Sequence, residues 1–318
     1  MPDASYCGPG NRIRLRALLL RQLGSCIVLS AGLHSDLSVA IAGVGLLGGS
    51  IAAALKRRGL ARRVIGIGRS AGRLQAAVDA GLLDGFTTDL QENDRDWNLV
   101  IVGTPVDRIA EDVRAIAAVS RPGTLITDVG SVKEPILKSL GLDSAEPMPL
   151  ADGVEFVGSH PLAGSEKRGF EAARANLFEN RVTVITPAAS NTSDAILRVR
   201  AFWESLASRV VTMTAADHDR ALATTSHVPH IAAAAVAAIL QPSQRDLAAT
   251  GFRDTTRIAA GDPDLWVAIL LANADAVLSS LRDLSDSLQS FDAAIRTRDA
   301  DQLRSLLQDA KEKRDALS

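Results

Sequence analysis

The sequence contains few aromatic residues, and it lacks the long basic or apolar runs that mark nucleic-acid-binding and membrane-spanning proteins. Aromatic residues make up 3% of the 318 residues, hydrophobic residues 47%, and the net charge is −2. Proteins that bind nucleic acid neutralise its phosphates with clustered lysine and arginine, and no long basic run occurs in this sequence. The apolar stretches 17–20 and 26–29 are far shorter than the roughly 20 residues of a membrane span. We therefore expect a partner that is neither nucleic acid nor a membrane.

Cysteine is also scarce. The two cysteines, Cys7 and Cys26, precede the first predicted strand, so the predicted folded body has neither a disulfide nor a cysteine metal ligand. This absence is typical of a protein of the reducing cytoplasm, where we expect the chain to be located. Residues 1–36 are interpreted as a disordered or mis-started N-terminal extension. A targeting segment is the alternative, because arginines precede a short apolar stretch there.

Short apolar segments alternate with helical segments from residue 38 to residue 213. Strands are predicted at 38–42, 64–68, 99–102, 124–128, 156–158, 182–186 and 209–213, and helices at 46–58 and 195–206 among others. Such alternation predicts βαβ units and a buried parallel sheet, and right-handed crossovers favour a doubly wound arrangement. Residues 37–213 are therefore predicted to form an α/β dinucleotide-binding Rossmann domain.

No strand is predicted after residue 213, so residues 214–318 are expected to form an all-helical domain. Segment 231–240 is almost entirely alanine, isoleucine and valine, which predicts a helix buried on every side. Long helices are predicted at 264–296 and 299–316. One small helical domain surrounds such a buried helix poorly, so we expect a homodimer through this domain. The alternative is a monomer in which this helix packs on the sheet domain.

A G-x-G-x-x-G sequence follows the first predicted strand and begins a predicted helix. This is the context in which the motif binds a dinucleotide, and a simple turn without a ligand is the alternative. Gly43 permits the tight turn, Gly45 lets the pyrophosphate approach the backbone, and Gly48 lets the helix pack closely on the strand. The free N–H groups at the helix start, at Leu46 and Leu47, would face the phosphates.

The end of the second predicted strand bears on the choice between NAD and NADP. NAD enzymes usually have an acidic residue there that binds the ribose 2′-hydroxyl, but this chain has Gly68, followed by Arg69 and Ser70. No carboxylate would repel a 2′-phosphate, and Arg69, Ser70 and Arg73 can bind one. We predict NADP as the preferred cofactor and keep NAD as the alternative.

Three further loops follow predicted strands and so lie at the carboxyl edge of the sheet, where ligands bind in this architecture. Thr104 and Pro105 follow strand 99–102 and are predicted to lie beside the nicotinamide, with an ordinary proline turn as the alternative. Ser131 follows strand 124–128, and His160 follows strand 156–158. A single histidine is more often structural than catalytic, but this position makes His160 a candidate base.

Four blocks of the helical half contain charged residues, histidine or tryptophan. They read DHDR at 217–220, SHVPH at 226–230, GFRDTTR at 251–257 and DPDLW at 262–266. His227 and His230 are spaced for one helix face, which also allows a metal site. No His-Glu-x-x-His pattern or nearby third ligand supports one, so no metal is predicted.

These blocks together resemble the prephenate/arogenate dehydrogenase family of tyrosine biosynthesis. The resemblance covers about residues 38–284 and consists of the glycine loop and five further motifs in the family's order. These motifs are residues 128–133, 158–164, 226–230, 251–257 and 262–266. Five ordered motifs are far more specific than a dinucleotide loop alone. The resemblance implies a Rossmann domain, a helical dimerisation domain, and oxidative decarboxylation of prephenate, or of arogenate, with reduction of NAD(P)+.

The resemblance also implies roles for individual residues. His160 matches the histidine that assists deprotonation of the ring hydroxyl, and Ser131 matches the serine that supports it. Arg257 matches the arginine that binds a substrate carboxylate, which suits the bidentate geometry of a guanidinium. The positions that match the rest of the substrate pocket are His227, His230, Arg253 and Trp266. Many relatives have lysine in place of Arg253.

Two other classes of protein share parts of this pattern. β-Hydroxyacid dehydrogenases also combine a Rossmann domain with helices, but they depend on a catalytic lysine in the second domain, and no lysine occurs between residues 215 and 310. A non-catalytic NADP-binding regulatory module would need the glycine loop but not Ser131, His160 and Arg257 together. Both alternatives are therefore disfavoured by the residues themselves.

Overall fold

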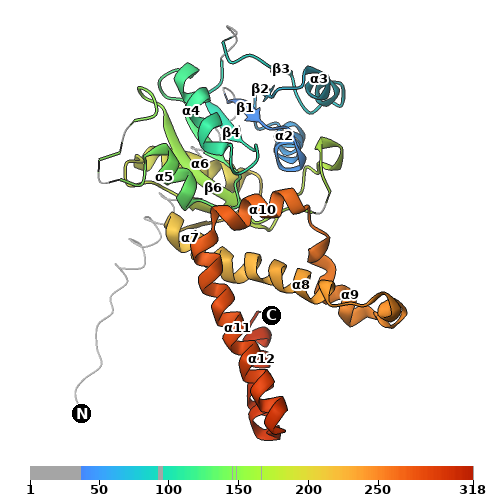
Figure 1. Ribbon diagram of the computed structural model, residues 1–318. Coiled ribbons are helices and arrows are strands. Elements are labelled where there is room, and N and C mark those ends of the chain that lie inside the picture. Colours follow the sequence, from blue (N-terminus) through green and yellow to red (C-terminus); the bar gives the residue numbers. More distant parts are fainter. Residues whose placement is uncertain (1–36, 92–95, 145, 148, 166, 318) are drawn as a thin grey trace, which may run out of the picture. The chain divides into compact units, whose positions relative to one another are not determined.

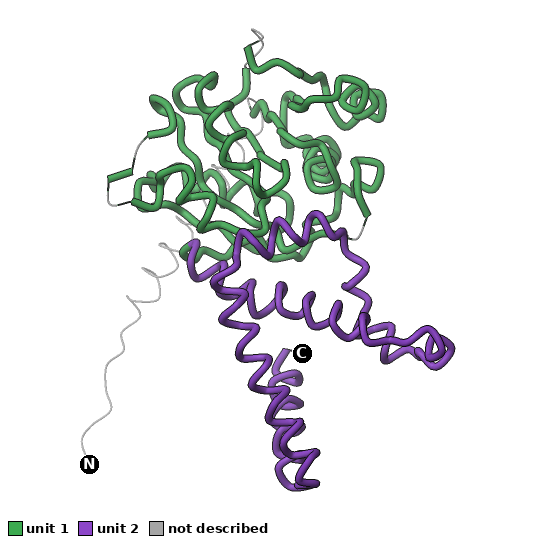
Figure 2. Tube along the Cα trace, in the orientation of Figure 1, with its two compact units in different colours: residues 1–214 green, residues 215–318 purple. Residues whose placement is uncertain are grey.

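The computed structural model describes residues 37–91, 96–144, 146–147, 149–165 and 167–317. The predictions for residues 1–36, including those for Cys7 and Cys26, lie outside the described residues. The chain divides into two compact units, residues 1–214 and residues 215–318, shown in different colours in Figure 2. Each unit is described by itself below.

Unit 1 contains one eight-stranded sheet (Figure 1). Its strands are β1 (Ser38–Ala42), β2 (Arg63–Ile67), β3 (Gly85–Thr87), β4 (Leu99–Val102), β5 (Leu125–Asp128), β6 (Glu155–Pro161), β7 (Val182–Thr186) and β8 (Arg209–Thr212). The spatial order is β3-β2-β1-β4-β5-β6-β7-β8. The first six strands in this order reproduce the doubly wound dinucleotide-binding arrangement, so the predicted Rossmann domain is confirmed.

Two features of the sheet differ from the sequence prediction. Strand β3 was not predicted, because three residues are too few to show a periodic pattern. Strands β7 and β8 are not parallel to the rest of the sheet: β6 pairs with β7 antiparallel, and β7 pairs with β8 parallel. Apolar runs show that a strand is buried but not its direction, so the prediction of a wholly parallel sheet was wrong at this edge.

Helices cover both faces of the sheet. Those of unit 1 are α2 (Leu46–Arg58), α3 (Ala71–Asp79), α4 (Ile109–Val119), α5 (Glu134–Leu140) and α6 (Ser193–Ser205). Val39 and Ile41 of β1 belong to the main hydrophobic cluster. Ala40 lies between them, points to the opposite face and is also fully buried. The sheet is therefore buried on both sides, as a doubly wound fold requires.

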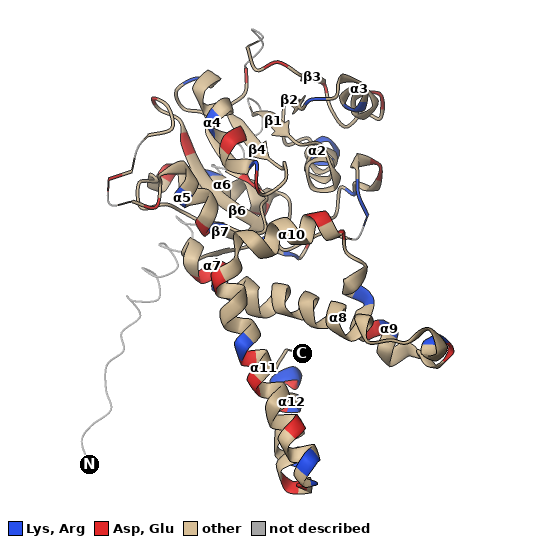
Figure 3. Cartoon of the chain, viewed as in Figure 1, with Lys and Arg blue, Asp and Glu red and all other residues tan. Residues whose placement is uncertain are grey.

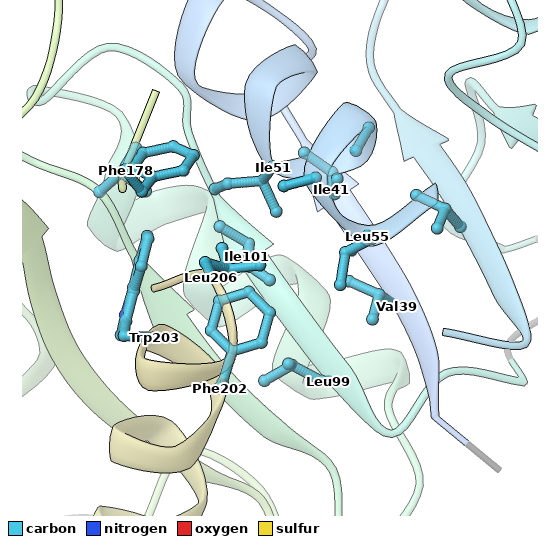
Figure 4. Close-up of a cluster of buried hydrophobic side chains, with 14 of the residues drawn as sticks. Val39, Ile41, Ile51, Leu55, Leu99, Ile101, Phe178, Phe202, Trp203 and Leu206 are labelled. Atoms are coloured by element: carbon cyan, nitrogen blue, oxygen red, sulfur yellow. The ribbon is translucent and has the colours of Figure 1, made fainter. Parts of the chain in front are cut away.

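Three aromatic residues of unit 1, Phe178, Phe202 and Trp203, lie together in its core (Figure 4). Trp203 of α6 is fully buried and lies edge-on to Phe178 and Phe202, at ring-centroid distances of 5.5 and 5.2 Å. Aromatic pairs in this geometry add about 0.5–1.5 kcal/mol beyond the area that they bury. Aliphatic residues of α2, β1 and β4 surround these three rings.

Unit 2 consists of helices only among its described residues. They are α7 (Ala215–Leu222), α8 (Val228–Ala238), α9 (Thr250–Thr256), α10 (Pro263–Ala272), α11 (Ala274–Thr297) and α12 (Ala300–Asp315). A wide π-type turn (Ala223–His227) joins α7 to α8, and short 3-10 turns span Pro242–Leu247 and Arg257–Ala260.

The predicted long helix 264–296 is interrupted at Asn273. Helices α10 and α11 meet there at an angle of 96°. Asn273 has a non-helical backbone (φ −112°, ψ 31°), and its side chain hydrogen-bonds to residues distant in the sequence. Asparagine has a low helix propensity because its amide competes with the backbone for hydrogen bonds. The prediction of one helix was wrong because these long-range contacts leave no periodic signal.

Helix α8 is not buried on every side within the single chain. It contains no charged residue, as Figure 3 shows, yet Ala234, Ala235 and Ala238 are exposed, and Ile239 at its end is 72% exposed. The prediction that this helix is buried on every side is therefore not met within a single chain. No single described helix is long and apolar enough to cross a membrane; α10 and α11 meet such a test only as a pair across their bend.

Candidate active site

The glycine loop and the loop after β4 lie side by side at the point where the strand order reverses, between β1 and β4. Gly43 has a positive φ of 88°, which favours glycine. A Cβ atom on Gly43 would lie 2.6 Å from the carbonyl carbon of Gly103, so the two loops touch backbone to backbone. In an open α/β sheet this crevice at the carboxyl ends of the strands is where a ligand binds.

The other two glycines of the motif have different surroundings. A Cβ atom on Gly48 would lie 2.3 Å from the carbonyl oxygen of Gly43, so helix α2 can approach its strand only with glycine there. A Cβ atom on Gly45 would have no atom within 4 Å. Gly45 therefore borders open space at the start of α2, and no side chain caps this helix. Its first N–H groups are available to an anion, which the helix dipole also favours.

Thr104 adds a second observation that points to a ligand. Its hydroxyl oxygen is buried and has no hydrogen-bond partner among the described residues. Buried hydroxyl groups are normally hydrogen-bonded, so one without a partner indicates a missing ligand or water. Together with the space beside Gly45 and the uncapped helix, it fits the nicotinamide dinucleotide that the sequence predicts. Pro105, the next residue of this loop, is exposed.

At the end of β2, the described chain has no acidic side chain between Gly68 and Arg73. Arg69 and Ser70 are exposed, and the Ser70 hydroxyl accepts a hydrogen bond from the Arg73 N–H at the start of α3. A Cβ atom on Gly68 would make only ordinary contacts with Leu74, at 3.5 Å or more. Glycine is therefore not required at position 68 by packing.

His160 lies within β6. The prediction that it lies in a loop after this strand was wrong. Strand β6 continues to Pro161 because its second half pairs with β7, with His160 opposite Val184. The last pair between β5 and β6 joins Thr127 to Val157. His160 is three residues beyond this pair, so it lies past the carboxyl end of β5, at the predicted edge of the sheet. Its side chain is largely buried.

A buried ion pair connects the strand of His160 to the loop of Ser131. Lys133 Nζ donates to Asp128 Oδ2, and both side chains are buried, at 1% and 0% exposure. Lys133 Nζ also donates to the carbonyl oxygen of Ser159 at 3.0 Å, and the Ser159 N–H donates to Asp128 Oδ1 at 2.9 Å. The Gly130 N–H donates to Asp128 Oδ2 at 2.9 Å. The residues directly before Ser131 and His160 are thus held by the same carboxylate.

The side-chain hydroxyl of Ser159 is also held by hydrogen bonds. It lies 2.8 Å from Thr127 Oγ1, accepts from Trp203 Nε1 at 3.0 Å and donates to the carbonyl oxygen of Asp128. All these groups are buried, where hydrogen bonds are strong and unpaired groups are costly. The backbone that leads into His160 is therefore anchored to β5, α6 and the Ser131 loop. Ser131 itself is half-buried.

In unit 2, three rings from two of the predicted blocks pack together. Trp266 of α10 stacks on His230 of α8, with ring centroids 3.6 Å apart and planes inclined by 12°. His227 lies edge-on to Trp266, at 6.2 Å and 83°. A Cβ atom on Gly261 would lie 2.5 Å from Trp266 Nε1 and 3.0 Å from His230 Cε1, so glycine permits the stack. His230 Nδ1 is buried and has no hydrogen-bond partner among the residues that the structure describes.

The histidines of this cluster are predominantly neutral at physiological pH. His227 ends the π-type turn and is 1% exposed. Its pKa is lowered to about 4, mainly because the ring is buried; Asp219 acts in the opposite direction, and His218 adds to the decrease. Burial also lowers the pKa of His230. The described residues contain no group of three His, Cys, Asp or Glu that could hold a metal ion.

The two predicted arginines lie on the surface of unit 2. Arg257 begins the 3-10 turn that packs against α8. It is exposed and has no ion-pair or hydrogen-bond partner in the described part of the chain. Arg253 is also exposed, but its Nε donates to the carbonyl oxygen of Ala248 at 3.0 Å. Of the two, Arg257 has the free guanidinium that a carboxylate would bind.

Comparison with known proteins agrees with this arrangement. The model of the prephenate dehydrogenase nucleotide-binding domain matches residues 51–212, and that of the prephenate dehydrogenase dimerization domain matches residues 214–309. The chain belongs to the prephenate dehydrogenase family. This is a family of NAD-dependent oxidoreductases, so the chain is an enzyme and not a binding module alone.

Individual members of the prephenate dehydrogenase family are similar over most of their length. The chain is 33% identical to a prephenate dehydrogenase of Bacillus subtilis over 88% of its length and 76% of that protein's. It is 32% identical to a cyclohexadienyl dehydrogenase of Zymomonas mobilis, over 88% and 95%. The crystal structure of Aquifex aeolicus prephenate dehydrogenase with hydroxyphenyl propionate and NAD+ has a TM-score of 0.80 and 29% identity, over 89% and 99%. Synechocystis arogenate dehydrogenase has a TM-score of 0.74 and 30% identity, over 89% and 100%.

Four residues that hold these groups, three in unit 1 and one in unit 2, were not singled out from the sequence. Asp128 and Lys133 were part of a motif, but nothing in their spacing shows that they form a buried pair. Ser159 precedes the predicted histidine and was assigned no role. Asn273 occurs in a segment that reads as continuous helix. The only available signal was a lysine five residues after an aspartate that ends a strand.

We predict that Gly45→Ala and Gly48→Ala have different effects. The Gly45 methyl group would enter the open space at the start of α2, so the variant should fold normally but bind cofactor at least tenfold more weakly. The Gly48 methyl group would meet the Gly43 carbonyl at 2.3 Å, so that variant should lose stability even without cofactor. Thermal unfolding and calorimetric titration separate the two. Equal loss of melting temperature in both variants would contradict the prediction.

A second prediction concerns the buried pair. Lys133→Met leaves the Asp128 carboxylate without its partner and should lower the free energy of unfolding by about 3–5 kcal/mol. Adding Asp128→Asn removes the buried charge and should recover part of this loss. The control is Lys56→Met, whose ion pair with Asp84 is about one-third exposed and should cost under about 1 kcal/mol. Urea unfolding measures all three, and similar losses at Lys56 and Lys133 would refute the prediction.

Proposed function

We propose that this enzyme oxidatively decarboxylates prephenate to 4-hydroxyphenylpyruvate with reduction of NAD(P)+. The names of its relatives support prephenate as the first candidate and arogenate, which differs by an amino group in place of the keto group, as the second. The observation that carries the proposal is the position of His160. It lies past the end of β5, on a strand that the Asp128–Lys133 pair holds against the Ser131 loop.

The chemistry needs one group that accepts a proton from the substrate hydroxyl. We assign this task to the imidazole of His160, with Ser131 supporting it. When bound, NAD(P)+ accepts the hydride from the carbon that bears this hydroxyl. Loss of the ring carboxylate as carbon dioxide then makes the ring aromatic, and His160 can return its proton to the phenolate oxygen. Aromatisation supplies the driving force, so the protein mainly positions the reactants and moves one proton.

The substrate is a dianion and needs cationic donors. Arg257 is proposed to bind a carboxylate, since its guanidinium has no partner among the described side chains and offers two parallel N–H donors. His227, His230 and Trp266 are proposed to line the substrate pocket. They form one stacked cluster in unit 2, which supports a shared role. Arg253 is the weaker candidate, because it is bonded to Ala248.

The direct test is an absorbance assay of cofactor reduction with prephenate and with arogenate. His160→Asn should lower kcat by at least a hundredfold with little change in cofactor affinity, because general-base catalysis contributes about 10²–10⁴-fold. Arg257→Ala should mainly raise the KM for the substrate. Near-normal turnover of His160→Asn, or an unchanged KM of Arg257→Ala, would remove that residue from its role. No turnover of either substrate by the wild type would overturn the function.

We further propose NADP as the preferred cofactor. The support is the absence of an acidic side chain from Gly68 to Arg73 and the exposure of Arg69 and Ser70, which leaves both able to bind a 2′-phosphate. Wild-type kcat/KM should be higher with NADP+ than with NAD+. Gly68→Asp, for which packing leaves room, should reverse this order, and Arg69→Ala should weaken NADP+ alone. A wild-type preference for NAD+ would refute the proposal.

Finally, we propose a homodimer formed through unit 2. Of 13 large hydrophobic side chains exposed among the described residues, only Leu162 and Leu197 lie in unit 1, which leaves 11 in unit 2. Apolar surface concentrated in this way is typical of an interface. Ile239→Asp should give a monomer in analytical ultracentrifugation. The control is Leu197→Asp, on the exposed side of α6, which should leave the oligomeric state unchanged. A wild-type monomer would contradict the proposal.

A further inference from the structure

Asn273 occupies the junction of two helices and turns its side chain inward. It lies between α10 and α11, where the axis bends by 96°, and it is 6% exposed. The amide therefore has to find its partners within the protein. These partners come from the α7 region and from the π-type turn, more than 40 residues earlier in the chain.

One atom of this amide makes both contacts. Asn273 Nδ2 lies 2.8 Å from the backbone carbonyl oxygen of Asp219 and 3.1 Å from His227 Nδ1. A carbonyl oxygen can only accept, so the atom beside it must be the amide nitrogen and not the amide oxygen. That nitrogen has two protons, one for each partner. His227 Nδ1 must then accept, and the proton of the neutral ring is on Nε2.

The surroundings keep His227 in this neutral form. A charged ring would have a proton on Nδ1 that faces the protons of the Asn273 amide. The pKa of His227 is lowered to about 4, mainly because the ring is buried; Asp219 acts against this decrease and His218 adds to it. The Asp219 carboxylate is itself bonded to His218, at 2.6 Å between Oδ1 and Nδ1, with both side chains buried. Its backbone carbonyl, which is what orients Asn273, is thus supplied by a residue fixed in place.

On its other side, His227 adjoins Trp266 and, through it, His230. Trp266 contacts both histidines, His227 edge-on and His230 face to face, and His230 Nδ1 is buried without a hydrogen-bond partner among the described residues. An unsatisfied nitrogen in such a position points to a ligand at this cluster. We propose that Asn273 is a positioning residue that fixes the proton of His227 on Nε2, so that His227 offers an N–H donor to an oxygen acceptor of the substrate. That the ligand is the substrate rests on the proposed function. The assignment of the His227 proton to Nε2 does not depend on it.

The test uses the full-length protein with 15N-labelled histidine. Two-bond nitrogen–proton correlation spectra distinguish protonated from unprotonated ring nitrogens, and His227→Gln identifies the signals of His227. In the wild type at pH 7.5, we expect Nδ1 to be unprotonated and Nε2 protonated. Asn273→Asp presents an acceptor in place of the donor, so Nδ1 should become protonated. Asn273→Ala removes the donor, so the preference for the Nε2 proton should weaken.

Kinetics provide a second readout with a matched control. Asn273→Asp should raise the KM for the substrate by at least tenfold and leave the dissociation constant of the cofactor unchanged. The control is Ser280→Ala, which removes a hydrogen bond of 2.9 Å between Ser280 and Thr224 and so loosens the same two segments. It should change neither the His227 spectrum nor the KM. If Asn273→Asp fails to fold, the His227 spectrum and the substrate KM of Asn273→Ala test the proposal instead.

The outcomes separate this inference from the proposed function. A proton on Nδ1 in the wild type overturns the inference, as does an unchanged His227 spectrum in the Asn273 variants. A changed spectrum with an unchanged KM overturns the role in substrate binding. The expected wild-type spectrum with no turnover of prephenate or arogenate overturns the proposed function and supports Asn273 as the residue that sets the tautomer.

Discussion

The buried contact between Asp128 and Lys133 is the interaction on which the site in unit 1 depends. A desolvated ion pair contributes little net stability, but it becomes very costly when one partner is lost. Here each charge also binds backbone groups of Ser159 or Gly130, so most of their hydrogen-bonding capacity is used. The main effect of the pair is therefore on geometry. It fixes the end of the loop before Ser131 relative to the part of β6 before His160. Both segments continue directly into residues proposed to act on the substrate.

In unit 2, hydrogen bonds among buried polar groups also fix separate chain segments relative to each other, but no lysine takes part in them. A buried polar chain runs from His218 through Asp219 and Asn273 to His227. It lies at a wide helical turn and at a sharp bend, and all four side chains are buried. Wide turns of this kind are frequently found at functional sites. In each unit, then, an aromatic ring, Trp203 or Trp266, packs against buried polar groups.

Local chemistry determined which features could be predicted from the sequence. The turn at Gly43, the start of α2 and the strand ends that precede Thr104 and Ser131 all follow from a few adjacent residues. The direction of β7, the three-residue strand β3 and the extension of β6 to Pro161 depend on pairing with distant strands. The bend at Asn273 depends on bonds to residues over 40 positions away. A lysine at position 133 looks like a surface residue until the fold buries it.

The mixed pairing of β6 has a consequence for how this sequence can vary. Strand β5 runs parallel to β6, and strand β7 runs antiparallel to it. A shift of β6 along its own axis would therefore break the register with both neighbours. A slip of one residue would also exchange the faces of Ser159 and His160. Deletions or insertions between Glu155 and Pro161 should therefore be far less tolerated than changes of side chain there. The position of the His160 imidazole is therefore fixed by the register of β6 with both of its neighbouring strands.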